Sequence, residues 1–435
     1  MRPLRKAQAK AGIFRVACAP QGRTKVGGGA EHVGEHHPVG RKRAASGGPV
    51  VIVAWALAAF AAAPLLVFAL ECLVGLRPDR APAPAGHAPP FTVLVPAHDE
   101  AAGIGVVVAA VRRQLRPGDR LLVVADNCSD ATAELAVRAG AAVCRRHDPA
   151  RAGKAFALAH GRAMLRADPP GVVIVLDADC LPEPGALVRL AAGAARGDAV
   201  QASNLLRCGP DAGPLVRIST FAFLLRNLIR QRGLRRLSGR ALLQGTGMAL
   251  PWRMFDAAPL ATASLAEDLR LGLDLALANY AVRFDEGAAV WSPAASQGAT
   301  RAQRTRWEHG SLATAAEYMP RLVAAASRGR PGLLVLAADL LVPPLSLLVA
   351  LVGAVGGALL LLALAGGPAG PLMLLAAAAC LFGGALALAW RGYGRTLLPA
   401  SALLRLPLYL LWKQPIYARL LAGSERRWVR TSRVP

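Results

Sequence analysis

Two aspartates stand close together directly after a run of apolar residues. Val172 to Leu176 reads Val-Val-Ile-Val-Leu and is followed by Asp177, Ala178 and Asp179. Such a run predicts a buried strand, which would deliver both carboxylates to one end of a sheet. Carboxylate oxygens suit Mg²⁺ or Mn²⁺, which often keep phosphate oxygens and water as their other ligands. The spacing therefore predicts a divalent metal site that binds a diphosphate. The alternative is that both residues cap a loop.

One lysine stands out in a chain that otherwise uses arginine for positive charge. Only six of the 51 Lys and Arg residues are lysines, and Lys154 is the only one between residues 42 and 413. It follows Gly153 at the start of a predicted helix, where a compact point charge can meet a phosphate. The pattern G-x-x-x-x-G-K-[ST] is absent, so this is not a P-loop. Chance composition is the alternative for this residue taken alone.

Acidic residues also follow two other predicted strands. Residues 91–95 lead into the loop from Pro96 to Glu100, and residues 121–125 lead to Asp126 and Asp130. Asp and Asn after a strand often cap the next helix, and for Asp130 this structural role is the preferred interpretation. Asp126 stays a candidate for ligand binding because parallel sheets bind ligands at the carboxyl ends of their strands.

Three further motifs complete an ordered set. They are Gln244-Gly-Thr-Gly-Met-Ala-Leu250, the acidic pair Glu267-Asp268, and Gln303-Arg-Thr-Arg306-Trp307. Together with Asp126, Asp177 and Asp179, in this order, they resemble the family 2 glycosyltransferases. The resemblance is greatest to the membrane-bound cellulose, chitin and hyaluronan synthases and their bacterial exopolysaccharide relatives. It covers residues 91 to 310 approximately and extends to the flanking membrane segments.

The resemblance implies a fold and a role for each motif. The fold is α/β, a GT-A domain that binds a nucleotide-diphosphate sugar and is inserted between transmembrane helices, with Mg²⁺ or Mn²⁺ as cofactor. Asp268 would be the general base that deprotonates an acceptor hydroxyl, and Asp177 and Asp179 would bind the metal. The substrate-binding residues, with Lys154 added from its own context, would be Pro96, Glu100, Asp126, Lys154, Asp177, Gln303, Arg306 and Trp307.

Two positions depart from the family pattern. Ala266 precedes the acidic pair where the synthases usually have Thr, and Ala125 precedes Asp126 where many relatives have a second Asp. The first change leaves the carboxylate of Asp268 in place. The second means that nucleoside binding would depend on one acid.

The last motif falls on a helix expected near residues 299–318. Residues three or four apart share a helix face, so Gln303 would lie beside Arg306 and Trp307. In the functional interpretation, the Trp307 indole stacks on the acceptor sugar while Gln303 and Arg306 hold the diphosphate. In the alternative, Trp307 anchors the helix at the membrane interface.

The elements that must position these residues alternate between strand and helix. We expect strands at 91–95, 121–125, 142–144 and 172–176, and helices near 101–116, 130–139, 153–167 and 183–196. This alternation predicts a parallel sheet covered by helices, with ligands bound at the carboxyl ends of the strands.

Two apolar blocks, residues 49–70 and 340–390, contain no Asp, Glu, Lys or Arg, and a bilayer explains them most simply. The expected organisation is a basic disordered tail (1–48), a transmembrane helix (49–76), a linker (77–90), the GT-A domain (91–330), an interfacial entry followed by a transmembrane helix (333–365), a second transmembrane helix (371–391), and a basic interfacial cytosolic tail (392–435).

Composition narrows the class further. The formal charge is +24, the apolar fraction is 54% and the mean hydropathy is +0.38. A chain this apolar is neither disordered nor an ordinary soluble enzyme. No zinc-finger, RNA-recognition or basic-zipper pattern accompanies the positive charge, so nucleic acid is not an expected partner. The seven cysteines form no C-x-x-C pair and are read as reduced thiols.

These features together predict a multi-pass protein of the cell inner membrane with its catalytic domain in the cytosol. Its partners would be a nucleotide sugar, most simply a UDP-sugar, a glycan or lipid acceptor, membrane lipids, and either further copies of the chain or polysaccharide-assembly proteins. One span before the domain places the N-terminus outside, although residues 41–43 are basic. Either the tail is an extension of the reading frame or the first segment is a helical hairpin.

Two other classes stay open from the sequence. The first is a non-catalytic membrane subunit that binds nucleotide or scaffolds polysaccharide assembly. The second is a transporter or channel, for which Glu71 and Asp339 are the acids at the membrane edge that could serve an ion path.

Overall fold

The computed structural model describes residues 48–79, 87–262, 264–294, 297–410 and 413, and for residues 297–306 it describes the helical backbone alone. The expected N-terminal tail, most of the linker and most of the C-terminal tail therefore lie outside the described residues. So do the side chains of Gln303 and Arg306.

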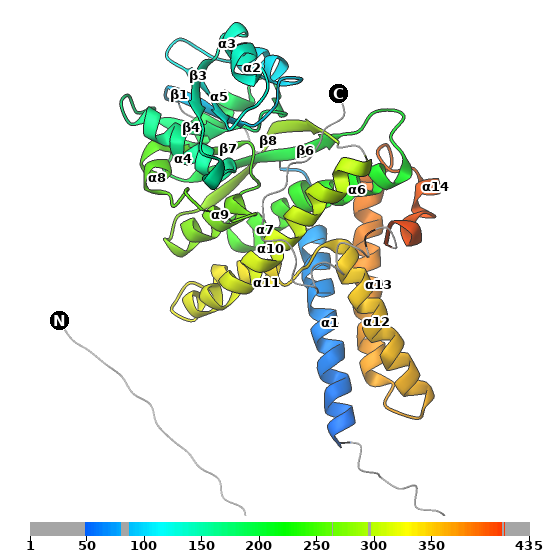
Figure 1. Ribbon diagram of the computed structural model, residues 1–435. Coiled ribbons are helices and arrows are strands. Elements are labelled where there is room, and N and C mark those ends of the chain that lie inside the picture. Colours follow the sequence, from blue (N-terminus) through cyan, green and yellow to red (C-terminus); the bar gives the residue numbers. More distant parts are fainter. Residues whose placement is uncertain (1–47, 80–86, 263, 295–296, 411–412, 414–435) are drawn as a thin grey trace, which may run out of the picture. The chain divides into compact units, whose positions relative to one another are not determined.

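A mixed sheet of eight strands forms the centre of the part of the chain outside the long apolar helices (Figure 1). Its order is β3-β2-β1-β4-β7-β6-β8-β5. The strands are β1 (Phe91–Ala97), β2 (Arg120–Asp126), β3 (Ala142–Arg146), β4 (Val172–Val175), β5 (Leu181–Pro182), β6 (Ala199–Arg207), β7 (Met248–Pro251) and β8 (Val282–Pro293). β1 to β4 are mutually parallel, whereas β7 pairs antiparallel with both β4 and β6. The four strands predicted from the sequence are confirmed.

Helices cover both faces of this sheet. The helices between β1 and α11 are α2 (Ile104–Arg112), α3 (Thr132–Arg138), the short η1 (Pro149–Arg151), α4 (Lys154–Leu165), α5 (Ala186–Ala194), α6 (Pro214–Leu224), η2 (Leu225–Arg230), α7 (Gln231–Ser238), α8 (Trp252–Ala257), α9 (Glu267–Leu277) and α10 (Gln297–Ala326). Because side chains alternate along a strand, Val93 packs with α2 and α5 while Leu94 packs with α4, α8 and α9. Burial on both faces explains why β1 and β4 read as continuous apolar runs.

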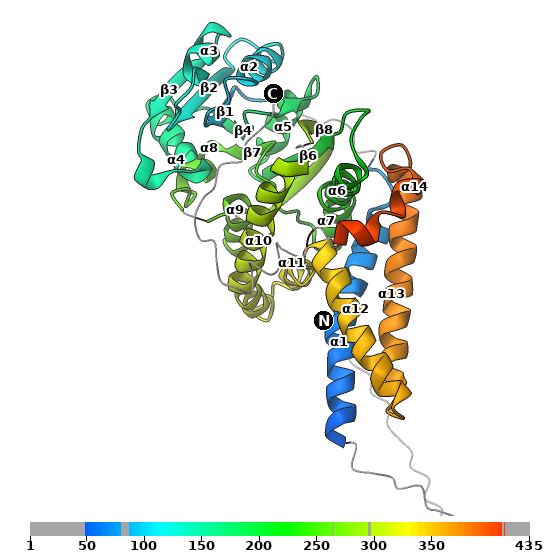
Figure 2. The ribbon, with the colours of Figure 1, turned by 45° about the vertical axis from the view of Figure 1, so that its right-hand side comes forward.

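Three helices are long and apolar enough to cross a membrane: α1 (Gly48–Gly75), α12 (Leu345–Leu364), and α13 (Gly370–Ala389) with the following turn η3 (Trp390–Gly394). Figures 1 and 2 show them side by side. The rings of Phe68 on α1 and Phe382 on α13 lie 4.9 Å apart between centroids. α1 is one continuous helix, so the alternative of a hairpin at this segment is wrong.

The segment expected at residues 333–365 divides into two helices with different surroundings. α11 (Gly332–Leu340) packs with Tyr318 and Leu322 of α10, and α12 begins after the turn at Pro343 and Pro344. Two consecutive prolines remove two backbone N–H donors and disfavour helical backbone in the residue before each of them, which explains the break. A short helix, α14 (Ala400–Leu403), follows the last apolar helix.

Candidate active site

The two aspartates of the D-x-D pattern lie just beyond the carboxyl end of β4. The backbone N–H of Asp177 donates to the Thr246 hydroxyl at 3.0 Å, which fixes the turn that leaves the strand. Ligand atoms of Asp177, Asp179 and Cys180 all lie within 4.8 Å of one another. Burial raises the pKa of the Cys180 thiol, and a neutral thiol is a poor metal ligand. The two carboxylates are therefore the groups here that could hold a divalent cation.

Lys154 connects the aspartate turn to the glycine-rich loop. Its ammonium forms an ion pair with Asp177 and donates to the carbonyl of Gly245 at 2.5 Å. Burial alone would lower the pKa of Lys154, but the surrounding carboxylates, Asp177 foremost, raise it above its usual range. The lysine is therefore held charged beside the predicted diphosphate site.

Gly245 is the point where three motifs meet. Its φ is +85°, and a Cβ built there would lie 3.1 Å from Oδ2 of Asp268 and 3.3 Å from Nζ of Lys154. A side chain would be both strained and crowded, so glycine is required. The structure thus brings Asp177, Lys154 and Asp268 together around one backbone position.

The acidic pair begins α9. The pKa of Glu267 is raised to about 7, by burial first and by the charge of Asp268 second, while the ammonium of Lys154 acts to lower it. Two adjacent acids at a helix N-terminus thus differ in environment, and Asp268 is the one whose carboxylate reaches Gly245.

A buried glutamine that the sequence analysis missed holds the glycine-rich loop. The Gln201 side chain is fully buried on β6; its Nε2 donates to Thr246 O at 2.9 Å and its Oε1 accepts from Gln244 N at 2.9 Å. It therefore fixes the loop on both sides of Gly245. No local signal marks Gln201 in the sequence, because its partners Thr246 and Gln244 lie 45 and 43 residues away.

Asp126 lies at the carboxyl end of β2 and is buried. Its Oδ1 accepts from Arg146 Nη1 at 2.6 Å and from Asn127 Nδ2 at 3.1 Å. Arg146 is a second residue that the sequence analysis missed. In the loop after β1, the backbone N–H of Glu100 donates to Thr132 Oγ1 at 2.7 Å.

Pro96 lies on β1, opposite Val124 of β2. It therefore belongs to the same edge of the sheet as Asp126. Asp130 accepts from Thr132 N at 2.9 Å and from Ala101 N at 3.0 Å, which confirms the structural role expected for it.

Trp307 lies on α10, the helix that packs against the residues just before the acidic pair. The Trp307 indole is half-buried, 5.9 Å between centroids from the Phe223 ring of α6. A Cβ on Gly310 would lie 3.0 Å from the carbonyl carbon of Leu265, so α10 presses against the chain that leads to Asp268. Trp307 thus makes a contact within the protein that a membrane anchor does not need.

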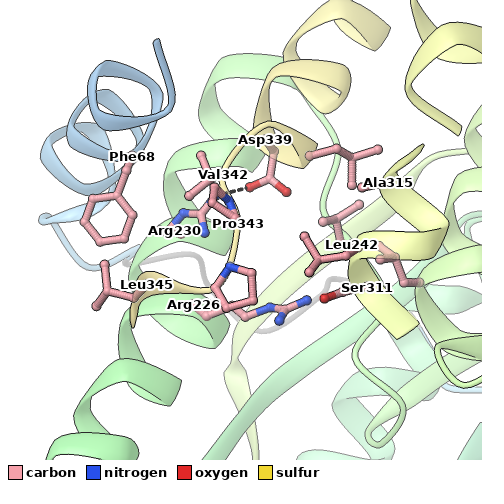
Figure 3. Close-up of a pocket in the computed structure, with 14 residues that line it drawn as sticks. Phe68, Arg226, Arg230, Leu242, Ser311, Ala315, Asp339, Val342, Pro343 and Leu345 are labelled. Atoms are coloured by element: carbon pink, nitrogen blue, oxygen red, sulfur yellow. Dashed lines mark hydrogen bonds and ion pairs between the residues drawn. The ribbon is translucent and has the colours of Figure 1, made fainter. Parts of the chain in front are cut away.

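A pocket lies between these elements and the apolar helices (Figure 3). Its walls come from α1, η2, α9, α10 and the turn between α11 and α12, and they include Phe68, Arg226, Arg230, Leu269, Ser311, Asp339, Pro343 and Leu345. Leu269, the residue after Asp268, is the part of α9 that lines this pocket.

Arg230 explains the two acids that the sequence analysis left open for an ion path. Its Nε donates to Glu71 at 2.7 Å and its Nη2 donates to Asp339 at 2.6 Å. Both acids are therefore in ion pairs that join α1 and α11 to η2. This structural role accounts for them without an ion path.

Comparisons with known proteins agree with this geometry. A family model described as "Glycosyltransferase like family 2" matches residues 89–310, more than half of the chain. The chain therefore belongs to this family of glycosyltransferases. A search among curated proteins finds no match.

One of two similar solved structures supports the fold. A mannosyltransferase from Pyrobaculum calidifontis, solved with GDP-mannose and Mn²⁺, is 21% identical, with 86% of this chain and 100% of that chain covered and a TM-score of 0.53. The glucosyl-3-phosphoglycerate synthase of Mycobacterium tuberculosis, solved with Mn²⁺, UDP-glucose and phosphoglyceric acid, is 19% identical over 53% of this chain and 84% of that chain, with a TM-score of 0.34. The mixed sheet and the first of these structures define a GT-A glycosyltransferase fold.

Proposed function

We propose that this protein is a membrane-bound, inverting, metal-dependent hexosyltransferase that transfers a sugar from a nucleotide-diphosphate sugar to a lipid-linked or growing polysaccharide acceptor. The observation that carries the proposal is the meeting of Asp177, Lys154 and Asp268 around Gly245. A diphosphate site and a base for an acceptor hydroxyl would then adjoin each other, as a single displacement at a sugar carbon needs.

The residues at the end of β4 fit a divalent metal. Asp177 and Asp179 offer carboxylate oxygens close together, the donor type that Mg²⁺ and Mn²⁺ prefer. When bound, the metal would supply positive charge to the diphosphate. The Pyrobaculum structure carries Mn²⁺ with its nucleotide sugar on this fold, which supports the same cofactor here.

The reaction then follows from the side chains of this chain. Asp268 takes the proton of the acceptor hydroxyl, and the hydroxyl oxygen forms a bond to the anomeric carbon. The bond from that carbon to the diphosphate breaks, and its electron pair leaves with the nucleoside diphosphate. The Lys154 ammonium, held beside Asp177, stabilises the charge that develops on the diphosphate.

The nucleoside would lie over the ends of β1 and β2. Asp126 is held by Arg146 at this edge, next to the loop from Pro96 to Glu100. We propose that these residues contact the nucleoside, with a UDP-sugar as the first donor to test. GDP-mannose is the second, because the Pyrobaculum enzyme was solved with it.

The acceptor would come from the membrane side. The pocket of Figure 3 is walled by Phe68 of α1 and Leu345 of α12 and reaches Leu269 beside the proposed base. This favours a lipid-linked acceptor or a growing glycan at the bilayer. We place the protein in the cell inner membrane and assign it to the synthase-like group of the family. Gln303, Arg306 and Trp307 would close the site.

The number of apolar helices bears on polymer export. The described residues contain three helices that could span a membrane, fewer than a channel for a long polymer generally needs. We propose that export, if the product is long, depends on further copies of the chain or on partner proteins.

The test is nucleotide release by the purified protein in detergent. UDP-sugars and GDP-mannose are supplied with Mn²⁺ and a membrane lipid extract, and EDTA and the Asp179→Asn variant serve as controls. We expect release from one donor, loss of release in both controls, and an inverted anomeric centre by NMR. Binding of nucleotide without release from any donor would instead identify a non-catalytic subunit, and full activity of Asp179→Asn in EDTA would remove the metal assignment.

A further inference from the structure

A second lysine is buried in an ion pair at the far side of the site. Lys413, near the C-terminal end of the described residues, is 4% exposed and pairs with Glu308, which is 5% exposed. Its ammonium also lies 5.5 Å from the centroid of the Tyr409 ring. Burying two charges is costly, so such pairs persist where they specify an arrangement.

The residue type strengthens this observation. Only six lysines occur among the 51 basic residues, and Lys154 and Lys413 are the only two after residue 42. Both form ion pairs with carboxylates, Lys154 with Asp177 and Lys413 with Glu308. A compact ammonium fits where the planar fork of arginine does not, so lysine here indicates a defined contact.

Glu308 is placed to hold the helix that carries Trp307. At about 100° per residue, Gly310 and Glu308 lie about 160° apart around α10, on nearly opposite sides, and Trp307 lies about 60° from Gly310. The Gly310 side presses on Leu265 and Ala266, the two residues before the acidic pair. The ion pair with Lys413 therefore holds α10 from behind, against the backbone that presents Asp268.

We propose that Lys413 is a positioning residue for glycosyl transfer, which acts through Glu308 to fix Trp307 and Asp268 relative to the acceptor. Lys413 would then contribute to the catalytic unit from beyond the apolar helices. This inference rests on the proposed function, because it assigns Trp307 and Asp268 to the acceptor side. It predicts that loss of the pair impairs acceptor use and spares the diphosphate site around Lys154 and Asp177.

The first test measures whether the pair holds the segment and does not depend on activity. An endoproteinase specific for lysine can cut after only six residues, and a cut at Lys413 releases residues 414–435, which mass spectrometry detects. We expect slow release from the wild type and faster release from Glu308→Gln, by about tenfold or more, because the lysine loses its partner. Glu317→Gln is the matched control. Glu317 lies on α10, like Glu308, but its ion pair with Arg270 of α9 is at the surface. Equal release from all three proteins would overturn the proposal.

The second test separates positioning from a purely structural role. For Lys413→Met we expect transfer to the acceptor to fall by about 10-fold to 100-fold, while slow hydrolysis of the donor by water and donor KM stay within about twofold, because a small displacement of the acceptor side is enough. The swapped variant Glu308→Lys with Lys413→Glu should recover most of the transfer. Arg405→Met, which removes an exposed charge from the same segment, should match the wild type.

Distinct results would overturn distinct claims. Equal loss of hydrolysis and transfer in Lys413→Met, or a swapped variant as weak as the single ones, would assign Lys413 to general stability and overturn the positioning role. Normal transfer by Lys413→Met would also overturn the positioning role. If the wild type releases nucleotide from no donor, the proposed function fails, whatever the protease shows.

Discussion

At the scale of single residues, the acidic pair shows how environment separates two adjacent carboxyls. Asp268 reaches the backbone of Gly245 beside Lys154, whereas burial and the neighbouring charge raise the pKa of Glu267 to about 7. We expect Asp268→Asn to lose transfer by about 10²-fold to 10⁴-fold, the usual contribution of a general base, and still to bind nucleotide. Glu267→Gln should lose less. Initial rates and calorimetric binding of UDP and GDP check this, and retention of the anomeric configuration would contradict the role of Asp268.

The raised pKa of Glu267 also predicts a pH dependence of stability. In metal-free protein the folded state keeps the Glu267 proton up to about pH 7, while an unfolded glutamate loses it near 4.5. The unfolded state therefore binds fewer protons between these values, and the free energy of unfolding falls as pH rises through them. Glu267→Gln removes this loss.

The variant should thus gain on the wild type between pH 5 and pH 8, by about 1 to 3 kcal/mol or several degrees in Tm. Thermal unfolding in EDTA at the two pH values measures the difference. A gap between the two proteins that is the same at both values would show that Glu267 titrates normally.

Residue identities could be predicted from sequence only where the chemistry is local. The carboxylates after β4 and the lysine after Gly153 stand out from their neighbours, so the sequence alone marked them as candidates. Arg146 and Gln201 could not, because their partners Asp126 and Thr246 are distant in the chain and nothing local marks either contact.

At the scale of elements, the same distinction separates the two halves of the sheet. β1, β2 and β4 are largely buried apolar runs, so their pattern alone predicted them. β6 contains Gln201, Ser203 and Asn204, all buried, and their polar groups bond to residues 40 or more positions away. A polar strand whose partners are remote has no local signature, so neither β6 nor its neighbours β7 and β8 was predicted.

The contact between α10 and the acidic pair gives a prediction at this scale. Gly310→Ala places a methyl group 3.0 Å from the Leu265 backbone, so α10 must move away from the segment that ends at Asp268. We expect transfer to fall by about tenfold or more, since small misplacements of reacting groups are costly. Gly105→Ala on α2 is the matched control, because its methyl group meets nothing within 4 Å.

Rates of transfer and of donor hydrolysis for both variants check this. The control should equal or exceed the wild type in stability, because alanine favours a helix by up to about 1 kcal/mol over glycine. Unchanged transfer by Gly310→Ala would show that α10 does not set the position of the base.

At the scale of the whole described chain, α7 attaches the catalytic unit to the apolar helices. Gly75 and Gly233 allow the backbones to touch where α1 crosses η2 and α7, since a Cβ on Gly233 would overlap Glu71 of α1 and a Cβ on Gly75 would overlap Ile229 of η2. The buried Arg232 donates to Gly75 O at 2.6 Å, to the Tyr393 hydroxyl at 3.0 Å and to Glu286 at 2.5 Å. It thereby ties the first apolar helix, the turn after the last one and β8 to one guanidinium.

Because of this attachment, the orientation of the apolar helices decides on which side of the membrane the active site lies. The catalytic unit follows the Gly75 end of α1, and the uncharged turn at residues 365–369 joins α12 to α13 at their other ends. Arg77, Arg391 and Arg395 gather at the catalytic end, and basic residues favour the cytosolic side. We therefore expect the catalytic unit in the cytosol, where nucleotide sugars are made, and the 365–369 turn outside. Reporter fusions at residues 85 and 368 measure this directly: 85 should report a cytosolic position and 368 an external one. A cytosolic 368 with an external 85 would reverse the topology and separate the site from its donor.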